Sequence, residues 1–367
     1  MKPNRITVEY AGRSKHDIDQ ILGLNRLEYG PKDIIATRAD FAWRCDENPA
    51  GPTVITVMRD PRGDIVGYIF LVPIKARIRG ADRLAAMGTN LVIRSDYRNT
   101  VGYVKLIRQF ERSLRENSIP LHYSFISEEF YRQLRGRGTQ TVCTIPLLIK
   151  PLNLKALIED YFPGKWQRLM IRQAGRMISP FFFTKPSLHC ADEIVVRTTD
   201  SFDSRFDEFW GWTKDKYSAM VIRDLAFLSW RFAPVSGRNY HILAAYRRDQ
   251  MLGYMVIRCA TVRGIKTGLI LDLLLLDHPR QMEAGMCLIS QAEAFFRTRE
   301  MSLAAALMSP QVVEYRILFK SGYRCLAPAI SPRPFRLAFF LHDKAQESLK
   351  SLTIGDWFIT FADYESH

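Results

Sequence analysis

Apolar and polar residues alternate, or apolar residues run together, in two parts of the chain. Residues 54–58 and 65–72 flank a polar turn in the first half, and residues 240–246 and 252–259 flank another in the second half. Period-two alternation on both sides of a short polar turn is typical of paired β-strands. The pattern therefore predicts one antiparallel hairpin in each half of the chain.

The surroundings of the two hairpins repeat. A Trp-Arg pair precedes each of them, at Trp43-Arg44 and at Trp230-Arg231, and each hairpin contains a Gly-Tyr pair, at Gly67-Tyr68 and at Gly253-Tyr254. The tryptophan and the glycine are 24 residues apart in the first copy (67 − 43) and 23 in the second (253 − 230). Such close agreement in spacing indicates an internal duplication.

A long amphipathic helix is predicted after each hairpin, at residues 101–117 and 280–299, and an apolar strand follows at residues 121–126 and 303–308. Strands outnumber the helices inserted between them, so the expected class is α+β. We expect two tandem domains, each with a mixed, mostly antiparallel sheet flanked by helices. The expected boundaries are 1–150 for the first domain, 151–190 for a linker and 191–367 for the second domain.

The chain carries 52 Lys and Arg against 38 Asp and Glu, a formal net charge of +14, which favours an anionic partner such as a phosphorylated cofactor, RNA or a membrane surface. The six cysteines form no C-x-x-C pair, so neither a zinc site nor a disulfide framework is expected. We interpret them as free thiols in a reducing cytoplasm. The amino terminus does not resemble a signal peptide, and no run reaches the roughly 18 apolar residues of a membrane span.

The predicted linker has its own pattern. Within residues 165–185 basic side chains are interleaved with Trp166, Met170 and the aromatic run 181–183. One interpretation is peripheral membrane contact through an interfacial helix. The other is a linker helix that packs against one of the sheets, as most amphipathic helices do.

Residues 91–115 carry the most informative chemistry. The stretch runs from an apolar strand through a turn with Arg94 and Arg98 into a helix whose first turn holds Gly102. Amides in the first turn of a helix lack internal partners, and the helix dipole adds positive potential there. The stretch therefore predicts an anion site that suits a pyrophosphate.

At these residues the chain resembles the GNAT acyltransferase family, specifically its double-domain members, over about residues 30–145 and 210–340. The resemblance implies a loop that holds the pyrophosphate of an acyl-CoA, and two strands that splay apart to admit the pantetheine arm. Arg98 matches the first position of the family's Arg-x-x-Gly-x-Gly loop, whereas Val101 and Tyr103 stand at the expected glycines. The implied cofactor-binding residues are Val92, Ile93, Arg94, Arg98, Asn99, Thr100, Val101, Gly102 and Tyr103.

Acyl transfer needs a base for the acceptor, an acid for the leaving thiolate and a donor for the oxyanion. The resemblance implies that the acid is Tyr131, on a short helix after the fifth strand; the alternative is a tyrosine packed against the sheet. Asp272 interrupts an apolar strand, so it is either catalytic or paired with an arginine or backbone amides. His122 is a candidate base, or a histidine satisfied by a neighbour.

The expected function is that of an acyl-CoA-dependent N- or O-acyltransferase without a metal. The acyl group, in the first place acetyl from acetyl-CoA, would go to an amine or hydroxyl of a small-molecule, amino-sugar or surface-polysaccharide precursor. Two alternatives stay open. One is a Fem-like peptidyltransferase that uses aminoacyl-tRNA, the only case in which a nucleic acid partner is expected. The other is a non-catalytic pseudo-acyltransferase that acts as a binding module, which the missing glycines favour.

Overall fold

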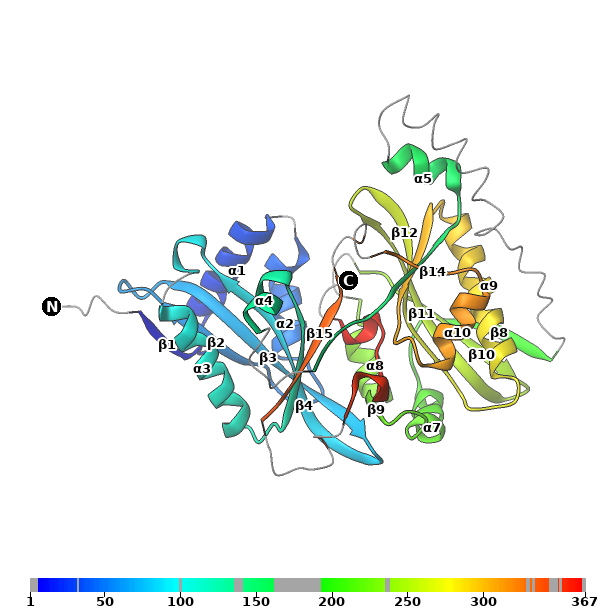
Figure 1. Ribbon diagram of the computed structural model, residues 1–367, viewed down its shortest axis with the longest axis horizontal. Helices are drawn as coiled ribbons and strands as arrows, with labels where there is room; N and C mark the ends of the chain where they lie inside the picture. The colour runs from blue at the N-terminus through cyan, green and yellow to red at the C-terminus, as the bar shows by residue number, and fades with distance from the viewer. Residues whose placement is uncertain are drawn as a thin grey trace. The chain divides into compact units, whose positions relative to one another are not determined.

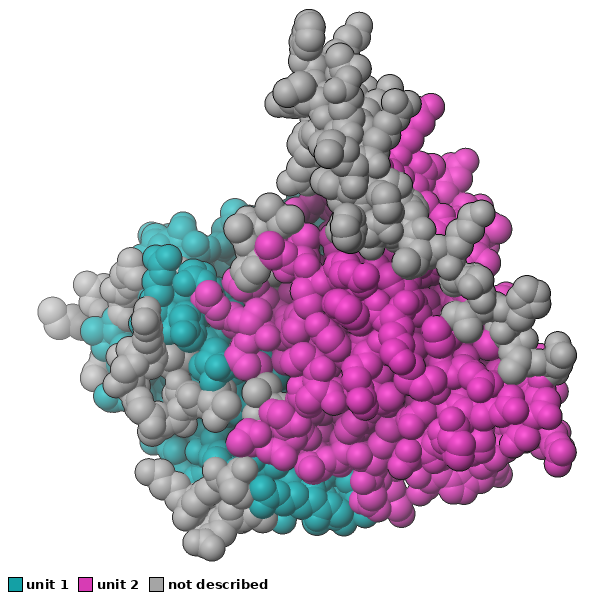
Figure 2. Space-filling view, turned by 45° about the vertical axis from the view of Figure 1, so that its right-hand side comes forward, with its two compact units in different colours: residues 1–142, 233–237, 337–352 teal, residues 143–232, 238–336, 353–367 magenta. Residues whose placement is uncertain are grey.

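The computed structural model describes residues 6–31, 33–98, 101–134, 141–161, 193–234, 238–327, 331, 334–342, 349 and 352–364. The chain forms two compact units, coloured separately in Figure 2. Unit 1 comprises residues 1–142, 233–237 and 337–352, and unit 2 comprises the remainder. In the described residues no helix is long and apolar enough to cross a membrane.

The elements that belong mainly to unit 1 are β1 (Thr7–Tyr10), α1 (Lys15–Tyr29), η1 (Ile34–Ala36), α2 (Arg38–Cys45), β2 (Val54–Arg59), β3 (Ile65–Ile78), β4 (Ala81–Ile93), η2 (Ser95–Tyr97), α3 (Val101–Glu116), β5 (Leu121–Ile126), α4 (Glu128–Leu134) and β15 (Arg336–Leu341). Strand β6 (Thr141–Thr144) ends the sheet path of this unit.

The elements of unit 2 are β7 (Leu147–Pro151), α5 (Leu154–Tyr161), β8 (Ile194–Thr199), α7 (Ser204–Thr213), β9 (Ala219–Val221), α8 (Leu225–Arg231), β10 (His241–Arg247), β11 (Gln250–Val262), β12 (Ile265–Leu275), α9 (Gln281–Thr298), β13 (Leu303–Leu307), α10 (Val313–Lys320), β14 (Arg324–Cys325), η3 (Ile354–Asp356), β16 (Trp357–Phe358) and η4 (Phe361–Asp363).

The main paths of the two sheets have the same order. One runs β1-β2-β3-β4-β5-β15-β6, and the other, from its opposite end, runs β8-β10-β11-β12-β13-β7-β14. In both, the first four strands pair antiparallel and the fourth pairs parallel with the fifth. Two mixed sheets flanked by helices confirm the predicted fold class.

The sixth strand of each sheet comes from a distant part of the chain. Strand β7 follows the elements of unit 1 directly but pairs with β13 in unit 2, and β15 follows the elements of unit 2 but lies between β5 and β6 (Figure 1). The boundaries at 150 and 190 expected from the sequence do not show this exchange. An apolar strand pattern indicates that a segment belongs to a sheet, but it does not indicate to which of the two sheets.

Buried polar contacts hold the exchanged strand β7 in place. Lys150 Nζ on β7 lies 2.7 Å from Glu293 Oε1 on α9 and donates to the carbonyl oxygen of Ser321 at 2.8 Å. Burial raises the pKa of Glu293, and the nearby ammonium of Lys150 opposes that rise. A buried pair is costly to break from one side, so these contacts fix β7 in unit 2.

Turn chemistry sets the register of both long hairpins. Two residues, Arg79 and Gly80, connect β3 to β4, and both have positive φ (48° and 77°). Arg263 and Gly264 connect β11 to β12 in the same way, with φ of 49° and 84°. Two consecutive residues with positive φ are typical of the type I′ turn, whose twist matches that of the paired strands.

Helix α3 packs against one face of the first sheet. Leu106, Phe110 and Leu114 form one stripe of this helix and contact a buried cluster that includes Leu71 and Ala86 of the sheet. Helix α1 lies on the other face, where the Tyr68 hydroxyl donates to Asn25 Oδ1. The core of unit 1 therefore fixes the start of α3 beside the end of β4.

Candidate functional site

The pairing between β4 and β5 is short. These parallel strands pair only at Ala86 with His122 and at Met87 with Tyr123, although β4 continues to Ile93 and β5 to Ile126. Beyond Met87 the two strands therefore diverge. The backbone groups that face β5 along this part of β4 are not used in that ladder.

A β-bulge lies in this divergent part of β4. Tyr68 pairs with Val92 and Phe70 pairs with Thr89, so the β4 side of the ladder has one extra residue. Asn90 lies within the bulge with φ of 54°, in the left-handed region that Asn tolerates better than most residues. Bulges redirect side chains and are common next to active sites.

The Asn90 side chain has an unused donor. Its Oδ1 accepts a hydrogen bond from Thr89 Oγ1 at 3.0 Å, but its buried Nδ2 has no partner among the described residues. An unsatisfied buried N–H group costs about 1–3 kcal/mol. An amide kept in this state beside two diverging strands is suited to a ligand oxygen.

Gly88 is the first residue of β4 after the last pair with β5. A Cβ atom at this position would lie 2.6 Å from Ser124 Oγ and 3.2 Å from Phe110 Cζ. A distance of 2.6 Å is too short for non-bonded carbon and oxygen atoms, and 3.2 Å between two carbon atoms is tighter than usual. The glycine therefore lets the Ser124 hydroxyl of β5 lie close to the backbone of β4 where the strands separate.

The predicted phosphate loop follows β4. Val92 and Ile93 are buried at the end of the strand, and Ile93 packs in the core. Arg94 Nε donates to Asp96 Oδ1 at 2.8 Å, and this hydrogen bond raises the pKa of the arginine and lowers that of the carboxyl. Arg94 also lies over the Tyr97 ring, 4.7 Å from its centroid.

Arg98 is placed between the strand end and α1. Its Nε donates to the carbonyl oxygen of Ile93 at 2.9 Å, and its guanidinium pairs with Glu28. The arginine side chain is nevertheless 54% exposed. An anion at the loop would therefore have to share Arg98 with Glu28.

The start of α3 has no acidic residue in its first turn. Val101 is 72% exposed, Gly102 is buried, and Tyr103 packs against the core of unit 1. Asn99 and Thr100 lie outside the described residues. The helix end is therefore electrostatically open to an anion, because no carboxylate of its own first turn competes for the first amides.

No protein-family model matches the chain, and no curated protein matches it. Solved structures do. A GCN5-related N-acetyltransferase from Anabaena variabilis superposes with a TM-score of 0.63 at 12% identity, over 92% of this chain and 73% of that one. The N-myristoyltransferase of Saccharomyces cerevisiae with bound myristoyl-CoA gives 0.58 at 13% identity, over 92% and 79%. An Enterococcus faecalis protein described as a probable N-acyltransferase gives 0.57 at 12% identity, over 92% and 73%.

The chain has the GCN5-related N-acetyltransferase fold. At 12 to 13% identity the likeness concerns the fold alone. This fold agrees with the resemblance of the sequence to the GNAT family. The resemblance implied two strands that splay apart, and β4 and β5 share only a short ladder. The assignment of functional residues depends on the geometry of this chain.

His122 is one of the predicted catalytic residues of this GCN5-related fold. Its ring is buried, stacks on Phe340 with 4.4 Å between ring centroids, and meets the edge of Phe110. Its Nδ1 lies 2.7 Å from Nε2 of His342, at the end of β15. Burial and the neighbouring His342 lower its pKa well below the usual range, so the ring is neutral near pH 7.

The histidine pair predicts a loss of stability in mild acid. Burial, assisted by the charge of Arg115, lowers the pKa of His342 from 6.5 to about 4. The unfolded chain therefore binds more protons than the folded chain below pH 6.5, and stability falls as the pH drops from about 6.5 toward 4. After allowance for solvent screening, we expect His342 to contribute a loss of about 1–2 kcal/mol between about pH 7 and pH 5. Urea unfolding at both pH values, with His342→Gln as reference, measures this loss. Equal pH dependence in the two proteins would refute it.

Tyr131 lies on α4, directly after β5. It is half-buried, and its backbone N–H donates to the carbonyl oxygen of Ser127 at 2.9 Å, which closes the first turn of the helix. Strand β5 therefore carries both His122 and the helix that bears Tyr131. His122 lies on the strand that borders the divergence and Tyr131 on the helix after it, and their catalytic roles remain a prediction.

Asp272 occupies the matching position in unit 2 and is fully buried. The tyrosine of each Gly-Tyr pair has a partner on the next strand: Tyr68 pairs with Val92, and Tyr254 pairs with Leu274. Asn90 and Asp272 each lie two residues before that partner. Asp272 Oδ2 accepts from Arg223 Nε at 3.0 Å and from the Tyr254 hydroxyl at 2.8 Å, and Oδ1 accepts from Thr360 Oγ1 at 2.8 Å.

The carboxylate of Asp272 is therefore fully occupied, and pairing with an arginine is the interpretation that the structure supports. We do not include Asp272 in the proposed catalytic set. Unit 2 also differs at its long helix, because the first turn of α9 contains Glu283. A carboxylate there opposes phosphate binding. The candidate site is therefore the one in unit 1.

Two residues of the site were missed by the sequence analysis. Asn90 has a usable signal, because it lies 182 residues before Asp272 (272 − 90), close to the offset of the repeat. His342 has none, because only the exchange of β15 brings it to His122. Among the described residues no group of His, Cys, Asp and Glu side chains is arranged to hold a metal.

Proposed function

We propose that unit 1 is an acyltransferase that takes its acyl group from an acyl-CoA. The divergence of β4 and β5 after Met87 and Tyr123, with the unpartnered Asn90 amide beside it, is the observation that carries the proposal. A pantetheine arm contains two amides along an extended chain, so it can use the backbone groups that β4 does not share with β5. The GCN5-related fold of the chain supports this choice.

The phosphates of the donor would lie at the start of α3. Amides in the first turn of a helix lack intrahelical partners, the first turn of α3 has no acidic residue, and Arg94 and Arg98 lie in the preceding turn. Val101 and Tyr103 replace the glycines of the family loop, and their side chains hinder the close approach of a phosphate to the backbone. We therefore expect the arginines to supply much of the phosphate affinity.

In the proposed acyl transfer, His122, Asn90 and Tyr131 each have one role. The acceptor amine or hydroxyl attacks the thioester carbon while His122, neutral at its buried position, takes the proton of the acceptor directly or through a water. The Asn90 amide donates to the carbonyl oxygen as it gains negative charge. The carbon–sulfur bond then breaks, and Tyr131 gives its proton to the departing thiolate. The proposed acceptor is a small molecule, such as an amino sugar or a surface-polysaccharide precursor.

Coenzyme A should stabilise the protein against thermal unfolding, and Arg98→Gln should remove most of this effect. A ligand at about 100 times its dissociation constant stabilises the folded state by about 2.7 kcal/mol, which is measurable as a rise in Tm. Differential scanning fluorimetry with free, acetyl- and longer acyl-CoA provides the measurement. The matched control is Arg38→Gln, because Arg38 is 53% exposed and paired with Asp19 much as Arg98 is 54% exposed and paired with Glu28.

A shift that persists in Arg98→Gln would place the phosphates elsewhere. If none of the three forms of coenzyme A shifts the Tm of the unmodified protein, the acyl-CoA proposal fails. The control variant should retain the full shift, since Arg38 lies in α2 and not in the turn between β4 and α3.

A further inference from the structure

Helix α3 presents a row of cations on its outer face. Lys105, Arg108, Arg112 and Arg115 are spaced by three or four residues, so they lie along the same side of the helix. Leu106, Phe110 and Leu114 occupy the opposite side and are buried. At about 1.5 Å per residue the row is roughly 15 Å long.

Three arginines of this row have no carboxylate partner in the described part of the chain. Arg108, Arg112 and Arg115 form no ion pair with the described residues, whereas eight other arginines of unit 1 each pair with a carboxylate. Glu116 accepts a hydrogen bond from Tyr10, and Glu111 pairs with none of the three arginines within the described residues. One helix face thus gathers three positive charges that no ion pair within the described residues balances.

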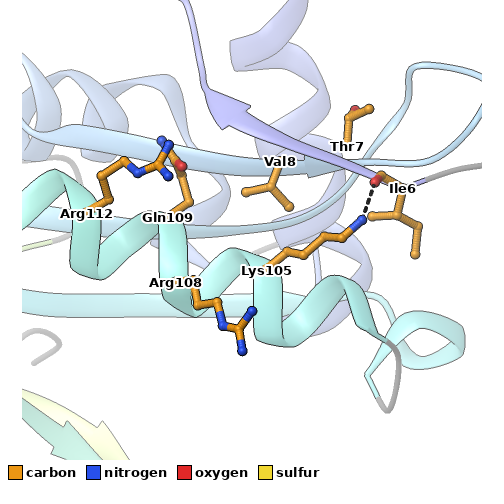
Figure 3. A pocket seen from close by; sticks show the side chains of 7 residues that line it. All are labelled: Ile6, Thr7, Val8, Lys105, Arg108, Gln109 and Arg112. Carbon is orange, nitrogen blue, oxygen red and sulfur yellow. Dashed lines mark hydrogen bonds between the residues drawn. The ribbon is translucent and has the colours of Figure 1, made fainter.

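A shallow groove of about 470 Å³ runs between this face and β1. Lys105, Arg108, Gln109 and Arg112 line its helical side, and no carboxylate lines it. Figure 3 shows that these side chains spread apart: Lys105 extends toward Ile6, whose carbonyl oxygen it contacts at 3.3 Å, and Arg108 points away from Lys105. Cations that spread in this way do not enclose one small anion. They fit an extended anionic surface.

Apolar side chains continue the row toward the start of the helix. Val101 precedes Lys105 by one turn and is 72% exposed, and Val104 precedes Arg108 by one turn and is 45% exposed. Exposed aliphatic residues next to a line of arginines gain little from a nucleic acid backbone, which offers phosphates and sugars. They gain from the boundary between lipid headgroups and acyl chains.

We propose that the outer face of α3 docks the protein onto a bilayer that contains anionic phospholipids. The cations would contact lipid phosphates, and Val101 and Val104 would reach the upper acyl region. The row from Lys105 to Arg115 lies outside the proposed acyl-donor site, which shares only Val101 and the start of α3 with this face. Vesicle binding and coenzyme A binding are measured separately, so either proposal can fail without the other. Docking would place the start of α3 at the membrane.

Flotation with vesicles tests the proposal on the full chain. Vesicles of phosphatidylcholine with one-third phosphatidylglycerol should bind the protein, and vesicles of phosphatidylcholine alone should not. Each cation near an anionic surface strengthens binding several-fold, so Arg108→Gln, Arg112→Gln and Arg115→Gln together should weaken it by about 100-fold. Binding should also fall as ionic strength rises.

A matched triple variant separates this face from the overall charge of the protein. Lys15→Gln, Arg62→Gln and Lys75→Gln remove three exposed cations from other parts of unit 1 and should retain most of the binding. An equal loss in both triple variants would overturn the proposal, as would the absence of binding to anionic vesicles. Binding of a short RNA at the same ionic strength with no binding of vesicles would overturn it too. Circular dichroism confirms that each variant is folded.

Discussion

Replacing Asn90 by Gly is expected to slow the release of free coenzyme A from acyl-CoA by about 100- to 1,000-fold, the usual effect of removing one oxyanion donor. Glycine accepts the φ of 54° at this position, so the bulge is preserved while the amide is lost. Stability should change by no more than about 1–2 kcal/mol, because the variant removes the hydrogen bond from Thr89 Oγ1 but also removes a buried Nδ2 that has no partner among the described residues. The measurement is thiol release from acyl-CoA, which requires no knowledge of the natural acceptor.

Ser118→Gly is the matched control for Asn90→Gly. Ser118 also has positive φ, 53°, but it lies after α3 and away from the strand divergence. The control variant should release thiol at the rate of the unmodified protein. A normal rate in Asn90→Gly would remove the amide from the proposed mechanism, even if coenzyme A still bound.

Replacing Arg223 by Met should have the largest effect on stability. Arg223 is fully buried between Asp272 and Asp363, with its NH2 group 2.7 Å from Asp363 Oδ2. Burial alone would favour the neutral guanidine, but the two carboxylates raise the pKa of Arg223 above its ordinary value. Removing the cation leaves two buried carboxylates without their main counter-charge, so we expect a loss of about 3–5 kcal/mol in urea unfolding.

Arg247→Met provides the comparison in the same unit. Arg247 pairs with Glu193 at the surface, where solvent screens the pair, so its removal should change stability little. A loss in Arg223→Met as small as that in Arg247→Met would contradict the expectation that Arg223 is the main counter-charge of Asp272 and Asp363. The pairing argument against a catalytic role for Asp272 would then fail.

The sequence pattern was sufficient for the local elements and for their repetition. The two hairpins, the long helices and the class were predicted because alternation, turn residues and the Gly-Tyr spacing are local properties. The turn Arg79-Gly80 gives a further local signal, because glycine tolerates the positive φ that a tight hairpin turn requires. Pairing partners are not local, and this is why the boundaries expected from the sequence contain no sign of the exchange of β7 and β15 between the two sheets.

The site was predictable only in part. Residues 91–115 stood out because a strand, two arginines and a helix start follow one another, and the structure places them beside the strand divergence. Asp272 stood out because a carboxylate in an apolar strand is conspicuous, yet its explanation is a buried arginine 49 residues away. Asn90 is less conspicuous, because an amide in a strand carries no charge. Its importance appears only when the hydrogen bonds around it are counted.

The exchange of β7 and β15 also constrains biosynthesis. When the ribosome has added β6, the amino-terminal sheet still lacks its sixth strand, and roughly two hundred further residues must be translated before β15 exists. The first sheet therefore cannot be completed until most of unit 2 has been translated, whereas the second sheet already has β7 when its other strands are made. Until β15 is made, the edge of β5 that it covers stays open in the nascent chain, and open strand edges favour aggregation. We expect a protein truncated between β6 and β15 to contain an incomplete first sheet.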